Sequence, residues 1–333
     1  MSIQQSGNWR KGFSKLTRTE AIGHIQRGLS LALLAVVCVF SRNSNAEAVH
    51  VMVPDSSRYY AQVADTITRH LHQQHPHITV TRLDSRNHSA RDIDAGDLML
   101  SIGTEATETV IGNYGQNPQL SLFITRSAWY KILGGSNVSP SRAVIFIDQP
   151  LSRSLALAQV LTGKHQFSTV LGPASTHRKA ELLAAAEVAG IALRYELIST
   201  TSNPLQVLSP LFDGSDAFIA VPDQGIINRN IARWVLHLGF KQKIPIIGFS
   251  RAYTEAGAAA SIYTAPGDIS QQGIDWLETY LANPNAEVWQ PYSPQYFSVA
   301  VNTSVANVLG LILVDEKTIH ERVKQRLQGG TLP

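Results

Sequence analysis

The chain has 333 residues, of which 44% are hydrophobic and 16% are charged, and it contains a single cysteine. This mixture is typical of globular proteins and excludes a disordered or collagen-like chain. One cysteine excludes an internal disulfide framework and a multi-cysteine zinc site. The net charge of +3 is uneven, because residues 1–46 hold six basic residues and one acid, which leaves residues 47–333 slightly acidic. The basic excess therefore gives no argument for nucleic-acid binding.

Residues 1–46 are predicted to be a signal peptide for secretion to the periplasm. The uncharged apolar run 29–40 follows a basic segment and precedes the small residues 44–46, as in secretory signals. We expect cleavage after Ala46, with a second site after Ala48. An uncleaved anchor is the alternative, although the run is shorter than the ~20 residues that span a bilayer. Lipidation of Cys38 is a further alternative, which Val37 disfavours because a small residue is needed there.

Short runs rich in Val and Ile alternate with helix-like segments along the rest of the chain. These runs lack strict alternation of apolar and polar residues, as expected of strands covered on both faces. Strands are predicted at 49–54, 78–83, 98–103, 120–124, 143–148, 169–172, 192–198, 217–221, 244–249, 259–263 and 297–301. Helices are predicted at 59–72, 106–113, 155–161, 178–188, 226–238, 269–281 and 316–327.

The repeated β-α-β order predicts an α/β fold with two Rossmann-like lobes, each with a parallel sheet, joined by a hinge. Segment 136–141, with its Ser, Asn and Pro residues, marks the joint. We predict that lobe 1 comprises 47–145 and is completed by about 250–290. Lobe 2 comprises 146–249 and is completed by about 291–333.

Polar residues follow many of the predicted strands, where open parallel sheets bind their ligands. Capping of the next helix is the alternative role for each of them. Taken together, they predict a cleft for an anion or a zwitterion, with Asp223 meeting an ammonium group and Arg251 a carboxylate. The predicted ligand contacts are Thr104, Thr125, Ser175, Asp223, Gln224, Ser250 and Arg251.

No catalytic or phosphate-binding motif is present: the sequence lacks Gly-x-Ser-x-Gly, Gly-x-x-x-x-Gly-Lys-Ser/Thr, His-Glu-x-x-His, and Gly-x-Gly-x-x-Gly after its first strand. We therefore predict neither an enzyme nor a cofactor. Four histidines crowd 70–77; we predict that they are exposed to solvent, with a zinc or nickel site as the alternative. Four aromatic residues near strand ends would either pack in the core or stack on a flat ligand: Tyr59, Tyr60, Trp129 and Tyr130.

Residues 217–273 resemble the type I periplasmic binding proteins of uncharacterised ABC transport systems, some of which bind aromatic amino acids. The resemblance is carried by Val-Pro-Asp-Gln at 221–224, Ile-Pro-Ile-Ile-Gly at 244–248, Ala-Gly-Ala-Ala at 256–259 and Gly273. It continues in Phe-Ser-Val-Ala-Val-Asn at 297–302, Ala306 and Leu-Gly-Leu at 309–311. It implies that Thr104, Ser175 and Asp223 contact the ligand.

The sequence departs from that family at three places. Gln224 replaces an Asn, Thr-Arg-Ser at 125–127 replaces an Asp-Pro, and Pro-Gly-Asp at 266–268 replaces a tyrosine-bearing turn. The ligand therefore need not be that of any relative.

These observations predict a monomeric solute-binding protein that holds a small polar ligand, such as an amino acid, between its lobes and delivers it to an ABC permease. Closure about the hinge would follow binding. A protein that reports to a membrane sensor is the alternative. The rival classes are a periplasmic enzyme using Asp223, Glu105 or Glu255, an accessory module with a degenerate cleft, and a repressor. A repressor would need a helix-turn-helix in place of the leader.

Overall fold

The computed structural model describes residues 48–54, 57–86, 93–134, 140–223, 229–283, 286–311 and 315–329, which belong to one compact unit. The predicted signal peptide, Cys38 and Gln224 lie outside these residues. Within the described part of the chain, no helix combines the length and apolar character needed to cross a bilayer.

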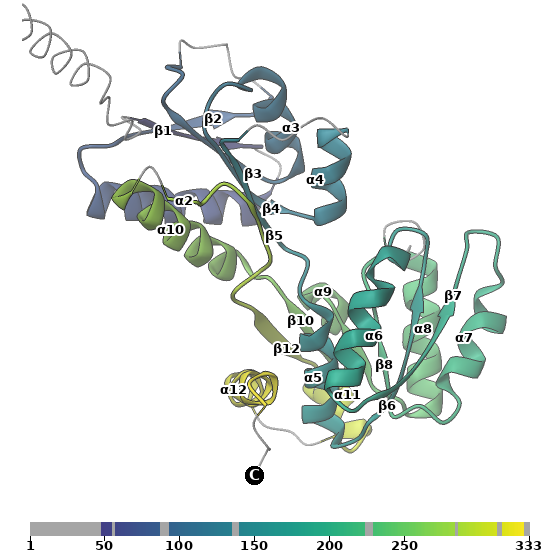
Figure 1. Cartoon of the computed structure of the whole chain (residues 1–333). Coiled ribbons are helices and arrows are strands. Elements are labelled where there is room, and N and C mark those ends of the chain that lie inside the picture. Colours follow the sequence, from purple (N-terminus) through teal and green to yellow (C-terminus); the bar gives the residue numbers. More distant parts are fainter. Residues whose placement is uncertain are drawn as a thin grey trace, which may run out of the picture. The chain divides into compact units, whose positions relative to one another are not determined.

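The first of two six-stranded sheets has the order β11-β5-β4-β3-β1-β2, and all its strands run parallel. Its helices are α2 (Arg58–Gln74), α3 (Thr104–Asn113), α4 (Arg126–Leu133) and α10 (Pro266–Ala282) (Figure 1). Its strands are β1 (Ala48–Val53), β2 (Thr79–Asp84), β3 (Leu98–Ile102), β4 (Gln119–Ile124), β5 (Arg142–Phe146) and β11 (Pro291–Tyr292).

The second sheet has the order β12-β10-β9-β8-β6-β7, with β12 antiparallel to β10 and the other strands parallel. Its strands are β6 (Gln166–Leu171), β7 (Ala192–Leu197), β8 (Ala217–Ile219), β9 (Ile246–Gly248), β10 (Ala260–Tyr263) and β12 (Ser298–Val301). The accompanying helices are α5 (Leu151–Thr162), the 3-10 turn η1 (Thr176–Arg178), α6 (Lys179–Val188), α7 (Pro204–Phe212), α8 (Arg229–Gln242), α9 (Arg251–Glu255), α11 (Thr303–Val308) and α12 (Glu316–Leu327).

Each sheet is covered on both faces, which explains the continuous apolar runs of its strands. The first sheet packs α2 and α10 on one face, and α3 and α4 on the other. The second sheet packs α5, α6 and α12 on one face. On the opposite face it packs α7, α8 and α9. The predicted fold class of two Rossmann-like α/β lobes is confirmed.

The chain passes between the two sheets three times, through 147–150, 264–265 and 293–297. Residues 251–263, which we predicted to complete lobe 1, form α9 and β10 of the second sheet. The return to the first sheet occurs at α10 and β11. The predicted joint at 136–141 precedes β5, so the first crossover comes after that strand.

Candidate functional site

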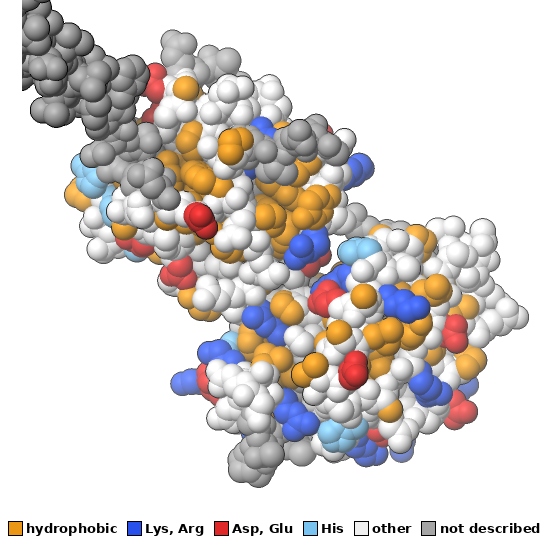
Figure 2. Space-filling view, in the orientation of Figure 1, with side chains coloured by type: hydrophobic (Ala, Val, Ile, Leu, Met, Phe, Trp, Pro, Cys, Tyr) orange, Lys and Arg blue, Asp and Glu red, His pale blue; other side chains and the backbone are white. Residues whose placement is uncertain are grey.

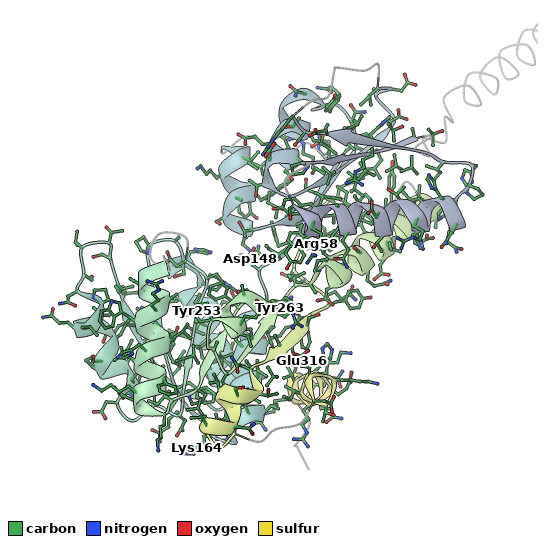
Figure 3. All side chains as sticks on the ribbon, turned by 180° about the vertical axis from the view of Figure 1, so that it is seen from behind. Arg58, Asp148, Lys164, Tyr253, Tyr263 and Glu316 are labelled. Carbon is green, nitrogen blue, oxygen red and sulfur yellow. The ribbon has the colours of Figure 1, made fainter. Side chains whose placement is uncertain are left out.

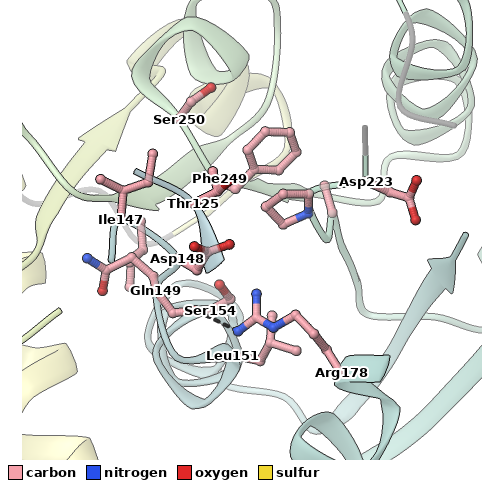
Figure 4. Close-up of a pocket in the computed structure, with 13 residues that line it drawn as sticks. Thr125, Ile147, Asp148, Gln149, Leu151, Ser154, Arg178, Asp223, Phe249 and Ser250 are labelled. Carbon is pink, nitrogen blue, oxygen red and sulfur yellow. Dashed lines mark hydrogen bonds between the residues drawn. The ribbon is translucent and has the colours of Figure 1, made fainter. Parts of the chain in front are cut away.

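A cavity of about 360 Å³ lies at the carboxyl ends of the second sheet's strands, beside the first crossover. Parallel sheets place ligands at this edge because the turns into the following helices meet there. The lining residues come from seven short segments: Thr125; Ile147, Asp148 and Gln149; Leu151 and Ser154; Arg178; Ala220, Pro222 and Asp223; Phe249 and Ser250; and Ile262 (Figure 4).

Asp148 places a carboxylate in this cavity. One of its oxygens, Oδ2, accepts a hydrogen bond of 2.6 Å from the backbone N–H of Arg126. Figure 4 shows the carboxylate near the middle of the cavity, and Figure 3 places Asp148 on the segment between the two sheets. A half-buried carboxylate held by a backbone donor is a ready partner for a ligand cation.

Arg178 supplies the opposite charge from the turn after β6. Its Nη2 donates to the backbone oxygen of Gln149 at 2.8 Å, and its Nε and Nη2 donate to the Glu181 carboxylate at 3.0 and 2.9 Å. Glu181 also accepts a hydrogen bond from the backbone N–H of Leu151. Although burial favours the neutral acid, the bonds from Arg178 and Leu151 outweigh it and lower the pKa of Glu181. The guanidinium is thus fixed, with 12% of its side chain exposed.

Asp223 lines the cavity, but its carboxylate accepts hydrogen bonds from the neighbouring turn after β6. Oδ2 accepts hydrogen bonds from the backbone N–H and from Oγ of Ser175, at 2.8 and 2.7 Å. Ser175 is fully buried, and its Oγ also accepts from the N–H of Gly172. In Figure 4 the Asp223 carboxylate is turned away from Asp148 and Arg178. Ser175 is therefore seen to hold the turn that carries Arg178.

Thr125 and Ser250 line the cavity as the caps of two helices. Thr125 Oγ1 accepts from the N–H of Ala128 at 3.2 Å, and Ser250 Oγ accepts from the N–H of Tyr253 at 3.1 Å. Capping and lining are therefore combined at these positions. The lining includes neither Thr104, which is exposed at the start of α3, nor Arg251.

Arg251 lies outside the cavity because two other partners engage it. Its Nε donates to the hydroxyl of Tyr263 at 2.9 Å, and Nη2 lies 3.6 Å from a carboxylate oxygen of Glu316. Figure 3 shows Tyr263 on β10 and Glu316 nearby on α12.

Gln149 connects the cavity to the three crossovers. Its buried side chain donates from Nε2 to Thr264 Oγ1 at 2.7 Å and to the Tyr296 carbonyl at 3.1 Å, and it accepts from Arg153. Thr264 in turn donates to the Ile147 carbonyl at 2.9 Å. Arg178 therefore binds the backbone of the residue whose side chain joins all three segments.

Sequence reasoning missed Asp148, Gln149, Arg178 and Phe249. Asp148 is the last residue of the predicted strand 143–148 and Gln149 directly follows it, so the strand-end rule would have found them if that strand had not been interpreted together with the joint. They do follow the observed strand β5, which ends at Phe146. Arg178 was predicted only as the first residue of a helix. No local signal separates it from other helical arginines, because its role depends on Gln149 and Glu181.

The aromatic residues predicted to pack or stack do not line the cavity. Trp129 on α4 is buried in the core against residues of β4 and β5. Tyr60 packs edge-on against Phe123, with ring centroids 5.4 Å apart. Tyr59 and Tyr130 are about half exposed. The ring that lines the cavity is Phe249.

The histidine cluster packs against helix α10. Nε2 of His70 and Nε2 of His75 lie 2.7 and 2.9 Å from the same oxygen of Glu278. Among the residues that the structure describes, no group of three or more His, Cys, Asp and Glu side chains could hold a metal ion. The alternative of a zinc or nickel site at 70–77 is therefore unsupported. The predicted exposure is confirmed for His72 and His77 and is wrong for His70 and His75, which are partly covered.

No protein-family model matches the sequence, and no curated protein matches it. The structure is similar to a ligand-free substrate-binding protein with adhesive properties from Clostridium difficile (TM-score 0.61, 13% identity, 81% of this chain and 97% of that chain). It is also similar to an ABC domain from Streptococcus pneumoniae in complex with L-Trp (0.51, 15%, 82% and 98%). A third similar structure is an arabinose-binding protein from Geobacillus stearothermophilus (0.51, 12%, 79% and 99%). The chain thus has the fold of type I periplasmic binding proteins.

Proposed function

We propose that the chain is an exported solute-binding protein that captures a small amino acid-like zwitterion and delivers it to an ABC permease. The observation that carries the proposal is the pair of opposite charges, Asp148 and Arg178, in one cavity. No ion pair joins these two side chains in the described structure: Arg178 is paired with Glu181 through Nε and Nη2, and Asp148 accepts one backbone hydrogen bond. Export rests on the predicted signal peptide.

The chemistry of the cavity suits the two ends of such a ligand. An ammonium group would donate to the Asp148 carboxylate. Within the described residues, the hydrogen bonds of Arg178 use Nε and Nη2, which leaves Nη1 for a ligand carboxylate. The ring of Phe249 and the side chain of Ile262 offer apolar surface for a side chain. A volume of about 360 Å³ is at the small end of ligand cavities.

The comparisons support a binding role without naming the ligand. One similar structure holds L-Trp and another is an arabinose-binding protein, so the fold serves chemically different solutes. The polar groups above favour the zwitterion over the sugar, because a sugar needs no charged partners. Binding would draw on the three crossovers as a hinge.

The ligand is identified by thermal unfolding after denaturation and refolding have removed any bound molecule. The library pairs each amino acid with its decarboxylated amine and its deaminated acid, and adds sugars. A ligand at 100 times its Kd adds about 2.7 kcal/mol, which raises Tm by roughly 5–10 °C. We expect the shift with intact amino acids and not with either half-molecule. A shift with sugars alone would overturn the ligand class, and no shift in the library would overturn solute binding of this kind.

Variants then locate the site. Asp148→Asn should abolish the shift, whereas Asp65→Asn, an equal change at an exposed pair with Arg82, should preserve it. Thr104→Ala and Arg251→Gln test the predicted contacts outside the cavity, and Asp223→Asn and Ser250→Ala test those that line it. A shift that survives Asp148→Asn would refute our assignment of the ammonium partner.

Delivery is tested by uptake of the identified ligand in cells with and without the chain. Lost uptake supports the permease. Retained uptake together with a lost transcriptional response to the ligand would instead support the sensor alternative.

A further inference from the structure

One face of helix α8 carries aromatic and basic side chains outward. The exposed residues at positions 233, 234, 237, 240 and 241 fall within an arc of about 120° at 3.6 residues per turn. We call this set the α8 face: Arg233, Trp234, His237, Phe240 and Lys241. The rings of Trp234 and His237 meet edge-on at 6.2 Å. Phe240 is 65% exposed and Trp234 is 40% exposed.

The rings of the α8 face are not needed to hold the helix. Ile231, Val235 and Leu238 are buried on its other side and pack into the core that α8 shares with α7. Two large exposed rings on one helical face are therefore surplus to packing. Scattered exposed apolar residues are normal, but a cluster on one face indicates an interaction surface.

The charge of the α8 face has one sign. None of its five residues is acidic, and the exposed Lys243 follows directly after the helix. Neighbouring α7 has no charged residue in its sequence and exposes Leu205. By contrast, acidic and basic side chains are interspersed over α5 and α6 on the opposite face of the sheet (Figure 2). Because residues 47–333 are slightly acidic overall, attraction to an anion would be local to this face.

We propose that the α8 face binds the surface of a bilayer that contains anionic phospholipid. Trp and Phe rings favour the boundary between headgroups and acyl chains, and Lys and Arg beside them favour the headgroup phosphates. An acidic protein surface would satisfy the cations but would not require two exposed rings, so the observations favour the lipid. Binding would keep the protein beside the membrane, and it does not depend on the ligand in the cavity.

The test is co-sedimentation of the purified protein with vesicles of phosphatidylglycerol and phosphatidylcholine, against vesicles of phosphatidylcholine alone. We expect binding to the anionic vesicles that weakens with added salt. Each cation near an anionic surface contributes about 1 kcal/mol, or about fivefold in affinity. The double variant Arg233→Gln/Lys241→Gln should therefore bind about 25-fold more weakly. Trp234→Ala/Phe240→Ala should remove the part of binding that resists salt.

A matched control removes two charges elsewhere. Lys317→Gln/Lys324→Gln on α12 changes the net charge equally, at two exposed positions, and should leave binding within about twofold because these cations lie outside the face. Unfolding curves of all variants should match that of the parent. The proposal would be overturned if the α12 control weakened binding as much as Arg233→Gln/Lys241→Gln does. It would also be overturned if Arg233→Gln/Lys241→Gln bound the anionic vesicles as tightly as the parent does. Binding to polyglutamate but not to anionic vesicles would assign the face to an acidic protein and overturn the lipid.

Discussion

The two sheets repeat one topology, yet they supply the candidate site unequally. The orders β5-β4-β3-β1-β2 and β10-β9-β8-β6-β7 correspond strand by strand, and each sheet gains its last edge strand from late in the chain. The lining residues after β6, β8 and β9 follow strands of the second sheet, whereas the first sheet contributes Thr125 and the crossover after β5. Equivalent positions in the two sheets therefore share a local role although the sheets contribute unequally to the cavity.

The caps after β4 and β9 show this most clearly. Thr125 and Ser250 occupy equivalent positions, cap equivalent helices and both line the cavity. The two sheets differ at the position two residues before each cap, which is Phe123 in the first sheet and Gly248 in the second. Phe123 has a φ of 58° at the point where β4 shifts register against β5. Gly248 lies in regular register opposite Ser261 of β10.

The largest expected effect is that of Gly248→Ala. A Cβ at this position would lie 2.3 Å from Ser261 Oγ and 2.8 Å from the Tyr253 ring. We expect a loss of about 3 kcal/mol in the free energy of unfolding, because the backbone must shift. Urea denaturation measures it. Gly267→Ala, whose Cβ meets nothing within 4 Å, should be nearly neutral; equal effects would contradict the packing of β9.

Gln149→Leu tests whether the crossovers depend on one side chain. The change leaves the partly buried partners Thr264 and Arg153 without their bonds to the buried Gln149 side chain. Unsatisfied buried polar groups cost about 1–3 kcal/mol, and we expect about 2. Gln271→Leu, on the exposed side of α10, should cost less than about 0.5 kcal/mol. A neutral Gln149→Leu would show that the crossovers hold without it.

Ser175→Ala should reveal the structural role of Asp223. It removes the 2.7 Å bond to the buried carboxylate and the acceptor for the Gly172 N–H. We expect a loss of about 1.5 kcal/mol in ligand-free protein, measured by thermal unfolding. The exposed Ser127→Ala serves as the control. If Ser175→Ala affected only the ligand-induced shift, Ser175 would be a ligand contact, as the family resemblance implies.

The smallest effect concerns the contact of Glu278 with His70 and His75. Partial burial opposes the charge of Glu278, but the hydrogen bonds from both histidines outweigh it and lower its pKa. The resulting stability is present above the ordinary carboxyl pKa of about 4.5 and is lost as pH falls through the lower folded value. Because Glu278 is 44% exposed, the increment is a few tenths of a kcal/mol. Denaturation curves between pH 3 and about 7 should show that Glu278→Gln lacks this pH-dependent increment of stability. The control Glu108→Gln, at an exposed position, should retain the increment.

Much of the fold could be predicted from the sequence. All eleven predicted strands overlap observed ones. Central strands such as β1 and β3 were found because buried parallel strands need unbroken apolar runs. The two-residue strand β11 and the helices α4, α7, α9 and α11 were missed. β11 is too short to form a pattern, and α9 and α11, with five and six residues, are defined by their caps more than by periodicity. Long α10 was predicted within a few residues because its apolar spacing covers several turns.

The sequence by itself determined the α/β class and the doubled topology, and it predicted that a ligand would bind at the strand ends. These depend on hydrophobic period and turn chemistry, which are local properties of the chain. Only the tertiary structure decided which strand-end residues meet: Asp148 and Arg178 line one cavity, Ser175 holds Asp223, and Arg251 turns to Tyr263 and Glu316. The reason is that a polar side chain takes the partner that folding brings within hydrogen-bond reach. That partner lies 12 to 65 residues away in these cases, beyond what any local pattern encodes.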